Sequence, residues 1–413
     1  MRKTHSIVLL LVLLAWPAGA TTFTMISDSA LADQAALIVQ ATVLASEPAP
    51  IAGPPSSDYF FQVERVVKGY VAGSTIVVRV LGGIGTDGIG LRIWGAPSFR
   101  QGERALLFLE PRGDGTYAIL HLMLGAFHER QVGDSRLAVR NLAETVEALT
   151  VTGEESLEDS LLDGPRDFEA FVEWLSGRDR GEARRADYLS RLGDGEMPVS
   201  GDPQVLLEDR CTGLNFRWSE FDRAKSVAWK LDIPRGRQGS SRSFFGQARS
   251  AWSRASGSRI QLTATRAVTP GAGFASADGV NALLLGDPKE QVAGEFRCSA
   301  GGILSVAGVW FDNGRSQECH FVEPGVKGTF RDQLFLEILE ADIVTNNGSA
   351  CFFVSNPSGE AEVLTHELGH TLGLSHSGVV DSIMRGPVHD DGRGAALDPS
   401  DRAVLGQLYD ISD

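Results

Sequence analysis

One stretch of the chain reads His366-Glu367-Leu368-Gly369-His370-Thr371-Leu372-Gly373-Leu374-Ser375-His376, in the pattern H-E-x-x-H-x-x-G-x-x-H. Two histidines four positions apart on a helix lie on the same face, because one helical turn takes 3.6 residues. The third histidine can join them only if the chain turns back after the helix. Gly373 makes that turn easy, because glycine has no Cβ and readily adopts positive φ.

This spacing predicts a metal site with three imidazole ligands, His366, His370 and His376. Three protein ligands leave the fourth position of a tetrahedral zinc ion open for water, which is the arrangement of a catalytic zinc. Glu367 adjoins the first ligand, where it can take a proton from that water. A bare H-E-x-x-H is often only a solvated helix face, whereas the extended motif is far more specific.

A methionine follows the third histidine in Asp381-Ser382-Ile383-Met384-Arg385. A long zinc motif followed by such a methionine turn is typical of metzincins. The region therefore resembles the metzincin metalloproteases, and within them the matrixin type, because Ser377 follows the last histidine and Ser-Ile-Met comes soon after. The resemblance implies Zn²⁺ as cofactor, hydrolysis of peptide bonds with Glu367 as general base, and Met384 beneath the metal. Alone, Met384 would most often be an ordinary core residue.

Composition and charge limit the class of protein and the kinds of partner that the chain can have. The chain has 413 residues, of which 43% are hydrophobic and 22% charged, so it is globular and long enough for two or three domains. Its net charge of −15 argues against nucleic acid and against anionic membrane surfaces as partners. No pattern in the sequence indicates an oligomeric state.

The first twenty residues have the features of a secretory signal peptide. Arg2 and Lys3 are basic, residues 7–16 are apolar but too few to cross a bilayer, and Ala18-Gly19-Ala20 has the small-residue pattern of a cleavage site. We expect cleavage after Ala20 and a mature chain that begins at Thr21 and is secreted, either extracellular or periplasmic. No later apolar run reaches the length of a membrane span.

The sequence predicts four segments: a signal peptide at 1–20, a β-rich accessory domain at 21–135, a helical acidic and arginine-rich connector or propeptide at 136–200, and a metzincin-like zinc metalloprotease domain at 201–413. Strands are expected in the second segment, where they predict a small barrel or sandwich that resembles OB-like netrin/TIMP-type modules. The expected strands are 36–43, 59–67, 75–80, 104–109 and 117–120. A helix is expected at 167–175.

The fold class expected for the catalytic part is α+β, with a mixed five-stranded sheet and a zinc helix. A β-α-β start implies partly parallel pairing with a right-handed crossover. The expected strands are 226–233, 259–265, 281–285, 302–310 and 338–344, and the expected helices are 240–256, 362–374 and 398–409.

The matrixin resemblance also implies where substrate binds. In matrixin-like sheets the fourth strand is an edge strand, antiparallel to the fifth, and an extended peptide adds to it through backbone hydrogen bonds. Here that edge is Gly302, Ile303, Leu304, Ser305, Val306 and Ala307. Residues 385–397 would form the wall of the side-chain pocket.

The chain has four cysteines, and an even number in an exported chain suggests two disulfides with three possible pairings. The strand order implied by the resemblance selects Cys298 with Cys351 and Cys211 with Cys319. Matrixins typically block the zinc with a propeptide P-R-C-G-x-P-D motif, and Asp209-Arg210-Cys211-Thr212-Gly213 is a poor match to it. The β-rich segment is therefore either an inhibitor of the cleft or an accessory binding domain.

The predicted function is a secreted zinc-dependent endopeptidase that acts on protein or peptide substrates, with Ca²⁺ as a further candidate ligand. The alternative is a zinc-bearing binding or adhesion protein with a vestigial protease site. The presence of Glu367 argues against this alternative, because a dead site can readily lose its general base.

Overall fold

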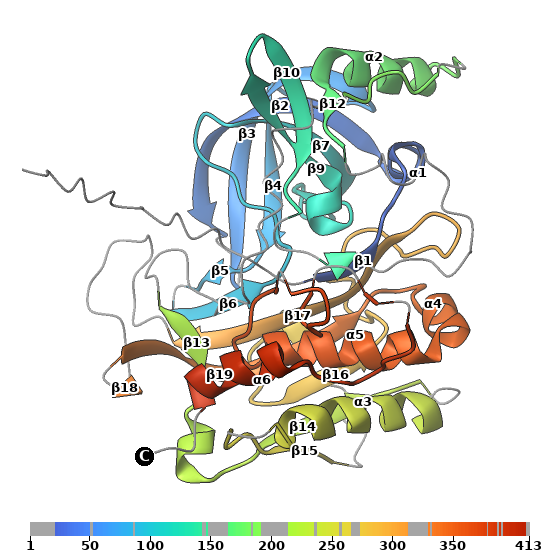
Figure 1. Ribbon diagram of the computed structural model, residues 1–413. Helices are drawn as coiled ribbons and strands as arrows, with labels where there is room; N and C mark the ends of the chain where they lie inside the picture. Colours follow the sequence, from blue (N-terminus) through green and yellow to red (C-terminus); the bar gives the residue numbers. More distant parts are fainter. Residues whose placement is uncertain are drawn as a thin grey trace, which may run out of the picture.

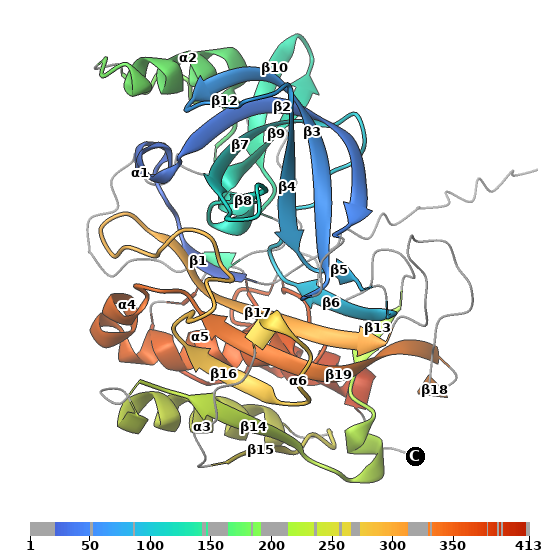
Figure 2. The same cartoon turned by 180° about the vertical axis from the view of Figure 1, so that it is seen from behind.

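The computed structural model describes residues 21–49, 53–85, 87–142, 146–147, 164–182, 185–190, 214–234, 238–255, 258–265, 273–312, 329–330, 333–377, 379–385, 388–389 and 391–409. Strand pairing groups these residues into an 8-stranded and an 11-stranded sheet. The smaller sheet lies above the larger one in both views (Figures 1 and 2). The protein is therefore α+β, with an all-β part joined to a mixed sheet and its helices.

Five strands of the smaller sheet close into a barrel, which selects the barrel from the two architectures expected for this region. They are β2 (Leu37–Pro48), β3 (Ser56–Lys68), β4 (Thr75–Leu81), β7 (Arg104–Pro111) and β8 (Tyr117–Ile119). The order β7-β2-β3-β4-β8 closes because β8 pairs with β4 in parallel and with β7 antiparallel. Val39, Ala41 and Val43 alternate along β2 and fill the barrel core. The likeness to OB-type modules stays a prediction.

The barrel is extended by short strands and two helices. They are α1 (Asp28–Gln34), β9 (Ala126–Val132), β10 (Ser135–Arg140), β12 (Arg166–Asp167) and α2 (Phe168–Asp179). Helix α2 confirms the helix expected at 167–175, whereas α1 was not predicted, although the Ser27 side chain caps it by accepting from the Ala30 amide. The buried Asp28 carboxylate accepts from Arg140, Arg166 and Tyr188. These hydrogen bonds join α1 to β10, to β12 and to the segment at 185–190.

The larger sheet contains all five strands expected for the catalytic part. They are β14 (Val227–Asp232), β15 (Leu262–Ala264), β16 (Asn281–Leu285), β17 (Gly302–Asp312) and β19 (Gln333–Thr345). The pairings β14–β15, β14–β16 and β16–β19 are parallel, and β17 is antiparallel to β19, as expected. Two short strands, β13 (Asn215–Arg217) and β18 (Thr329–Phe330), also pair with β19.

Helices cover one face of this sheet. They are α3 (Gln238–Ser253), α4 (Ala350–Ser355), α5 (Pro357–His370) and α6 (Pro399–Tyr409). Helix α5 packs against α3 and against β17 and carries the first two histidines of the motif. Figure 1 shows α5 and α6 in front of the strands, and Figure 2 shows the same strands from the other side.

Strands from the N-terminal half join the larger sheet, which corrects one expectation. β17 is the outermost strand of the C-terminal half, but its outer edge is not free. The strands β1 (Thr21–Thr24) and β6 (Ile89–Ile93) pair with it, and they pair in turn with β11 (Val146–Glu147) and β5 (Gly83–Ile84). A long apolar edge strand has unpaired amide and carbonyl groups along its length, and β1 and β6 supply partners for them.

The described cysteines agree with half of the predicted pairing. Cys298 and Cys351 form a disulfide with a Cα–Cα distance of 6.2 Å, which confirms that pair. The predicted pair of Cys211 and Cys319 lies outside the described residues. Among the helices in the described part of the chain, none is long and apolar enough to cross a membrane.

Candidate active site

Helix α5 and the turn after it bring the three histidines together. Asn356 caps the helix through its side chain, which accepts from the Gly359 amide, and the helix ends at His370. Gly373 follows at φ +88°, and a Cβ built there would lie 2.2 Å from the Phe216 carbonyl oxygen. Only glycine fits this turn, and the turn directs His376 back toward the helix, as the motif predicts.

The three imidazoles face one another as the ligands of a single ion would. The Nε2 atom of His366 lies 2.6 Å from that of His370 and 3.2 Å from that of His376. The Nδ1 atoms of His366 and His370 contact the carbonyl oxygens of Ile383 and Leu374, both at 2.7 Å. Because a carbonyl only accepts, each Nδ1 carries the proton and each Nε2 presents a lone pair.

Two nitrogen lone pairs at such a short distance repel each other unless a cation lies between them. Burial lowers the pKa of His366 to about 4 and lowers the pKa values of His370 and His376 well below the ordinary range, so the rings are neutral. Neutral imidazoles are the form that binds metal ions. A three-histidine metal site is therefore present, and its donor set fits zinc.

Glu367 lies beside this site in a fully buried position. Its Oε1 atom accepts from the Thr22 amide at 3.1 Å and from the Thr22 hydroxyl at 2.5 Å, while Oε2 is buried and has no hydrogen-bond partner in the described part of the chain. Burial raises the pKa of Glu367 to about 8, and the hydrogen bonds from Thr22 act in the opposite direction.

Met384 packs against the zinc helix at Gly369, and its place beneath the metal stays a prediction. It is fully buried, and a Cβ built on Gly369 of the zinc helix would lie 2.4 Å from its sulfur, so the glycine permits this close approach. The turn is held by the Ser377 amide, which donates to the Met384 carbonyl at 2.8 Å. The Asp401 carboxylate of α6 also holds it, because it accepts from the Ser382 hydroxyl and from the Ile383 amide.

The segment after the methionine turn is fixed to the zinc helix by one ion pair. Glu362 accepts from the amide and from Nδ1 of His389, both at 2.7 Å, and His389 Nε2 donates to the Val380 carbonyl at 2.6 Å. Burial tends to lower the pKa of His389, but the hydrogen bonds to Glu362 and to the Val380 carbonyl outweigh it, so this pKa is raised. Both ring nitrogens face oxygen acceptors, so this geometry favours the imidazole that donates from both nitrogens.

Trp94 is a site residue that the sequence motif did not reveal. Its buried indole stacks on the His370 ring, with 5.9 Å between ring centroids and an interplanar angle of 28°. The Trp94 carbonyl accepts from the Thr21 hydroxyl. Trp94, Thr21 and Thr22 come from the N-terminal half, so no local spacing around the histidines could have indicated them.

The predicted substrate edge is also occupied. Gly302 to Ala307 are all buried. The residue pairs along it are Thr21 with Val306, Thr22 with Ser305, Phe23 with Ile303 and Thr24 with Gly302. β1 therefore lies along the predicted substrate edge, and its Thr22 contacts Glu367, so a strand of the same chain lies where the resemblance implies a substrate.

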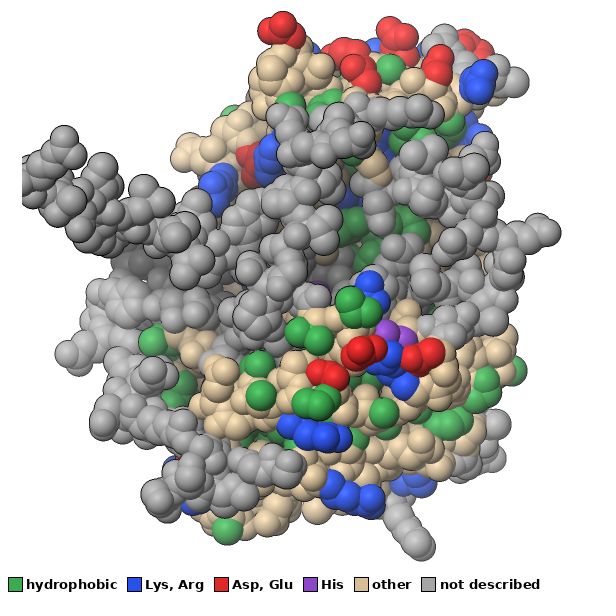
Figure 3. Space-filling model, in the orientation of Figure 1, with side chains coloured by type: hydrophobic (Ala, Val, Ile, Leu, Met, Phe, Trp, Pro, Cys, Tyr) green, Lys and Arg blue, Asp and Glu red, His purple; other side chains and the backbone are tan. Residues whose placement is uncertain are grey.

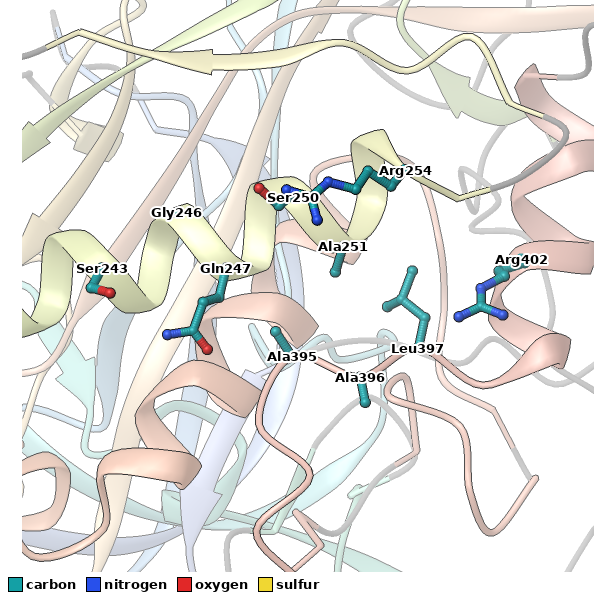
Figure 4. Close-up of a pocket in the computed structure, with 10 residues that line it drawn as sticks. All are labelled: Ser243, Gly246, Gln247, Ser250, Ala251, Arg254, Ala395, Ala396, Leu397 and Arg402. Carbon is teal, nitrogen blue, oxygen red and sulfur yellow. The ribbon is translucent and has the colours of Figure 1, made fainter.

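A cavity of about 670 Å³ lies elsewhere, between α3 and the chain that leads into α6 (Figure 4). Arg254 of α3 and Arg402 of α6 line it, and the other lining residues are Ser243, Gly246, Gln247, Ser250, Ala251, Ala395, Ala396 and Leu397. None of the metal-site residues lines this cavity, so its volume says nothing about the reaction.

Charged side chains do not gather into a basic patch on the face shown in Figure 3. Acidic and basic side chains lie side by side in the middle of this face, acidic ones gather at the top, and separate basic ones lie toward the bottom. Arg393, for example, pairs with both Asp381 and Asp391.

Residues 337–410 match the family model of the matrixins. The matched segment contains the three histidines, Glu367, Met384 and α6, so the site described above is a matrixin-like site and the resemblance read from the sequence is confirmed for this part of the chain. No curated protein gives a significant match to the chain.

Proposed function

We propose that the protein is a zinc-dependent endopeptidase. The observation that carries the proposal is the convergence of three neutral imidazole nitrogens beside the buried carboxylate of Glu367. The matrixin match over this segment supports it, because that family is a family of zinc peptidases. A vestigial site has no specific support, since the ligands and Glu367 are all in place.

Zinc at these nitrogens would supply a Lewis acid that polarises a water molecule and the scissile carbonyl. The role left to the protein is proton transfer. Glu367 adjoins the first ligand, and one of its carboxylate oxygens has no protein partner among the described residues, so it can take a proton from that water and pass it to the leaving nitrogen. His366 and His370 are held in the correct tautomer by the carbonyls of Ile383 and Leu374.

The substrate class follows from the strand beside the site. The backbone of Gly302 to Ala307 can pair with any extended peptide, because such pairing uses amide and carbonyl groups that every peptide has. β1 already shows this strand accepting an antiparallel partner here. We therefore propose proteins or peptides in extended conformation as substrates.

We also propose that the enzyme works outside the cytoplasm. The signal-like residues 1–20 support this location, and so does the Cys298–Cys351 disulfide, because such bonds persist mainly in oxidising compartments.

The test is Glu367→Ala, measured on the full chain with a mixture of internally quenched peptides and with elemental analysis for zinc. We expect the variant to keep its zinc and to lose cleavage by a factor on the order of 10² to 10⁴, the usual contribution of a general base. Glu173→Ala, an exposed glutamate on α2, is the matched control and should cleave like the wild type. Equal cleavage by Glu367→Ala, or a wild-type protein without zinc, would contradict the proposal.

A further inference from the structure

The outer edge of β17 is filled by two separate segments of the N-terminal half. β6 pairs with its C-terminal part and β1 with its N-terminal part. The Trp94 amide donates to the Ala307 carbonyl at 3.3 Å and fills the position between the two strands. Read from the C-terminal end of β17, the pairs are Asp312 with Ile89, Phe311 with Gly90, Trp310 with Leu91, Val309 with Arg92, Gly308 with Ile93, Val306 with Thr21, Ser305 with Thr22, Ile303 with Phe23 and Gly302 with Thr24.

The two segments run in the same direction. Both are antiparallel to β17, so the carbonyl end of one segment meets the amino end of the other at Trp94 and Thr21. The Thr21 hydroxyl donates to the Trp94 carbonyl across this junction, although the two residues are 73 positions apart in the chain. Together they follow the track that one continuous peptide would take along the edge.

The junction lies at the metal site. The Trp94 ring stacks on His370, and Thr22 donates its amide and its hydroxyl to Glu367. A bound substrate would have its scissile bond at this point, because the general base and the metal ligands must both reach it. No peptide bond joins Trp94 to Thr21, so the track along the edge is interrupted at the point where a substrate would be continuous.

We propose that the N-terminal half of this chain inhibits its own catalytic site, with Ile89–Trp94 and Thr21–Thr24 bound end to end as an uncleavable imitation of a substrate. This inference rests on the proposed peptidase function, and it specifies how that function is regulated. It also accounts for the poor match of Cys211 to the matrixin propeptide motif, because the occupied edge performs the blocking role that the cysteine performs in that family.

Apolar packing holds the two segments in place. One core cluster contains Phe23 and Ile93 from the inhibitory segments together with Ile303 and Val306 of β17. A Cβ on Gly90 would lie 2.2 Å from the Phe311 ring, so β6 approaches β17 as closely as a glycine allows. Burial of this kind stabilises the closed arrangement, so substrate competes poorly for the edge and the full chain cleaves slowly until the packing is disturbed.

The test disturbs β1 alone. Thr22→Asp removes the hydroxyl that donates to Glu367 and puts an acidic side chain into a fully buried position of β1, where taking a charge out of water is costly. We expect kcat/KM for the quenched peptides to rise by roughly tenfold or more, since tenfold needs only a modest loss of closed-state stability. Thr75→Asp, the same change at an exposed position of β4, is the matched control and should match the wild type. Thr22→Val is a milder variant that loses only the hydroxyl bond, and its rate should rise less.

Two further measurements distinguish a failure of the proposed inhibition from a failure of the proposed peptidase function. The gain in Thr22→Asp should disappear in the double variant Thr22→Asp/Glu367→Ala, and hydrogen exchange at residues 302–306 should speed up in Thr22→Asp. If wild type, Thr22→Asp and Thr22→Val all cleave at one Glu367-dependent rate, the peptidase function stands and the inhibition is wrong. If none of them cleaves although zinc is bound and exchange at residues 302–306 has risen, the peptidase function is wrong, and the inhibition falls with it.

Discussion

Individual residues of the metal site were predictable because the information for them is local. Three ligands, a base and a turn glycine lie within one short stretch, and helix geometry alone places His366 and His370 on one face. Asp401, Thr22 and Trp94 were not predictable, because each reaches the site from a distant part of the sequence. The pairing of Glu362 with His389 was missed for the same reason.

Gly373 gives a test at the scale of one residue. Gly373→Ala must either keep φ near +88° or relieve the contact with the Phe216 carbonyl, and the left-handed conformation alone costs an L-residue about 1–2 kcal/mol. We expect a lower Tm and weaker zinc binding by titration, because His376 depends on this turn. Gly246→Ala in α3 adds the same methyl group in open space with ordinary helical φ, and it should be neutral or stabilising. A Gly373→Ala protein with wild-type Tm and zinc affinity would contradict the role given to the turn.

At the scale of elements, alternation and helical spacing identified the barrel strands, the strands of the mixed sheet and the main helices, because each of these has a clear apolar face. β1 and β6 escaped prediction. β1 has only four residues, and β6 contains Gly90 and Arg92, so neither has the pattern of an independent strand. Both form because β17 offers them unpaired backbone groups. Helix α1 escaped because it is short and precedes the first predicted strand.

The contact between α5 and the segment after the methionine turn is testable by titration. Because His389 has a raised pKa, its contribution to stability is fully present below the ordinary histidine value of about 6.5 and is lost as pH rises through the folded-state pKa. In NMR spectra of the labelled protein, His389 should titrate above that ordinary value, and Glu362→Gln should lower its pKa. Asp391→Asn, which removes a nearby exposed charge, should shift it much less. An unchanged His389 titration in Glu362→Gln would show that the pair does not set this pKa.

At the scale of the whole molecule, the N-terminal and C-terminal halves share a buried histidine. His121 Nε2 contacts Gln34 Oε1 at 3.0 Å, and its ring lies against Gly294 and Gly302, where a Cβ would come within 2.9 and 2.6 Å of ring atoms. The sequence had indicated two folded parts but not that the first would complete the sheet of the second. Such a contact between distant segments leaves no periodic signal in either one.

His121 predicts how acid affects the protein. Burial lowers its pKa to about 4, and Arg140 and Arg297 act in the same direction. Its neutral form therefore contributes stability that is complete above the ordinary value of about 6.5 and is lost as pH falls from there toward about 4, by up to about 3 kcal/mol. His121→Asn keeps a residue type that tolerates φ of +51° but does not titrate. When urea unfolding is measured as a function of pH, the free energy of unfolding should fall less on acidification for His121→Asn than for the wild type. If it falls equally in both proteins, His121 is not the source of this acid sensitivity.

The pairing of β1 with β17 also has a consequence for the order of events during biosynthesis. Residues that meet in this pairing are separated by most of the chain, so the contact is formed late and only after both halves exist. A chain is made from its amino end, so the residues of the barrel leave the ribosome before the histidine helix has been made. The C-terminal half would then fold against an N-terminal half that has already formed, so the edge of β17 would be covered as soon as that strand folds.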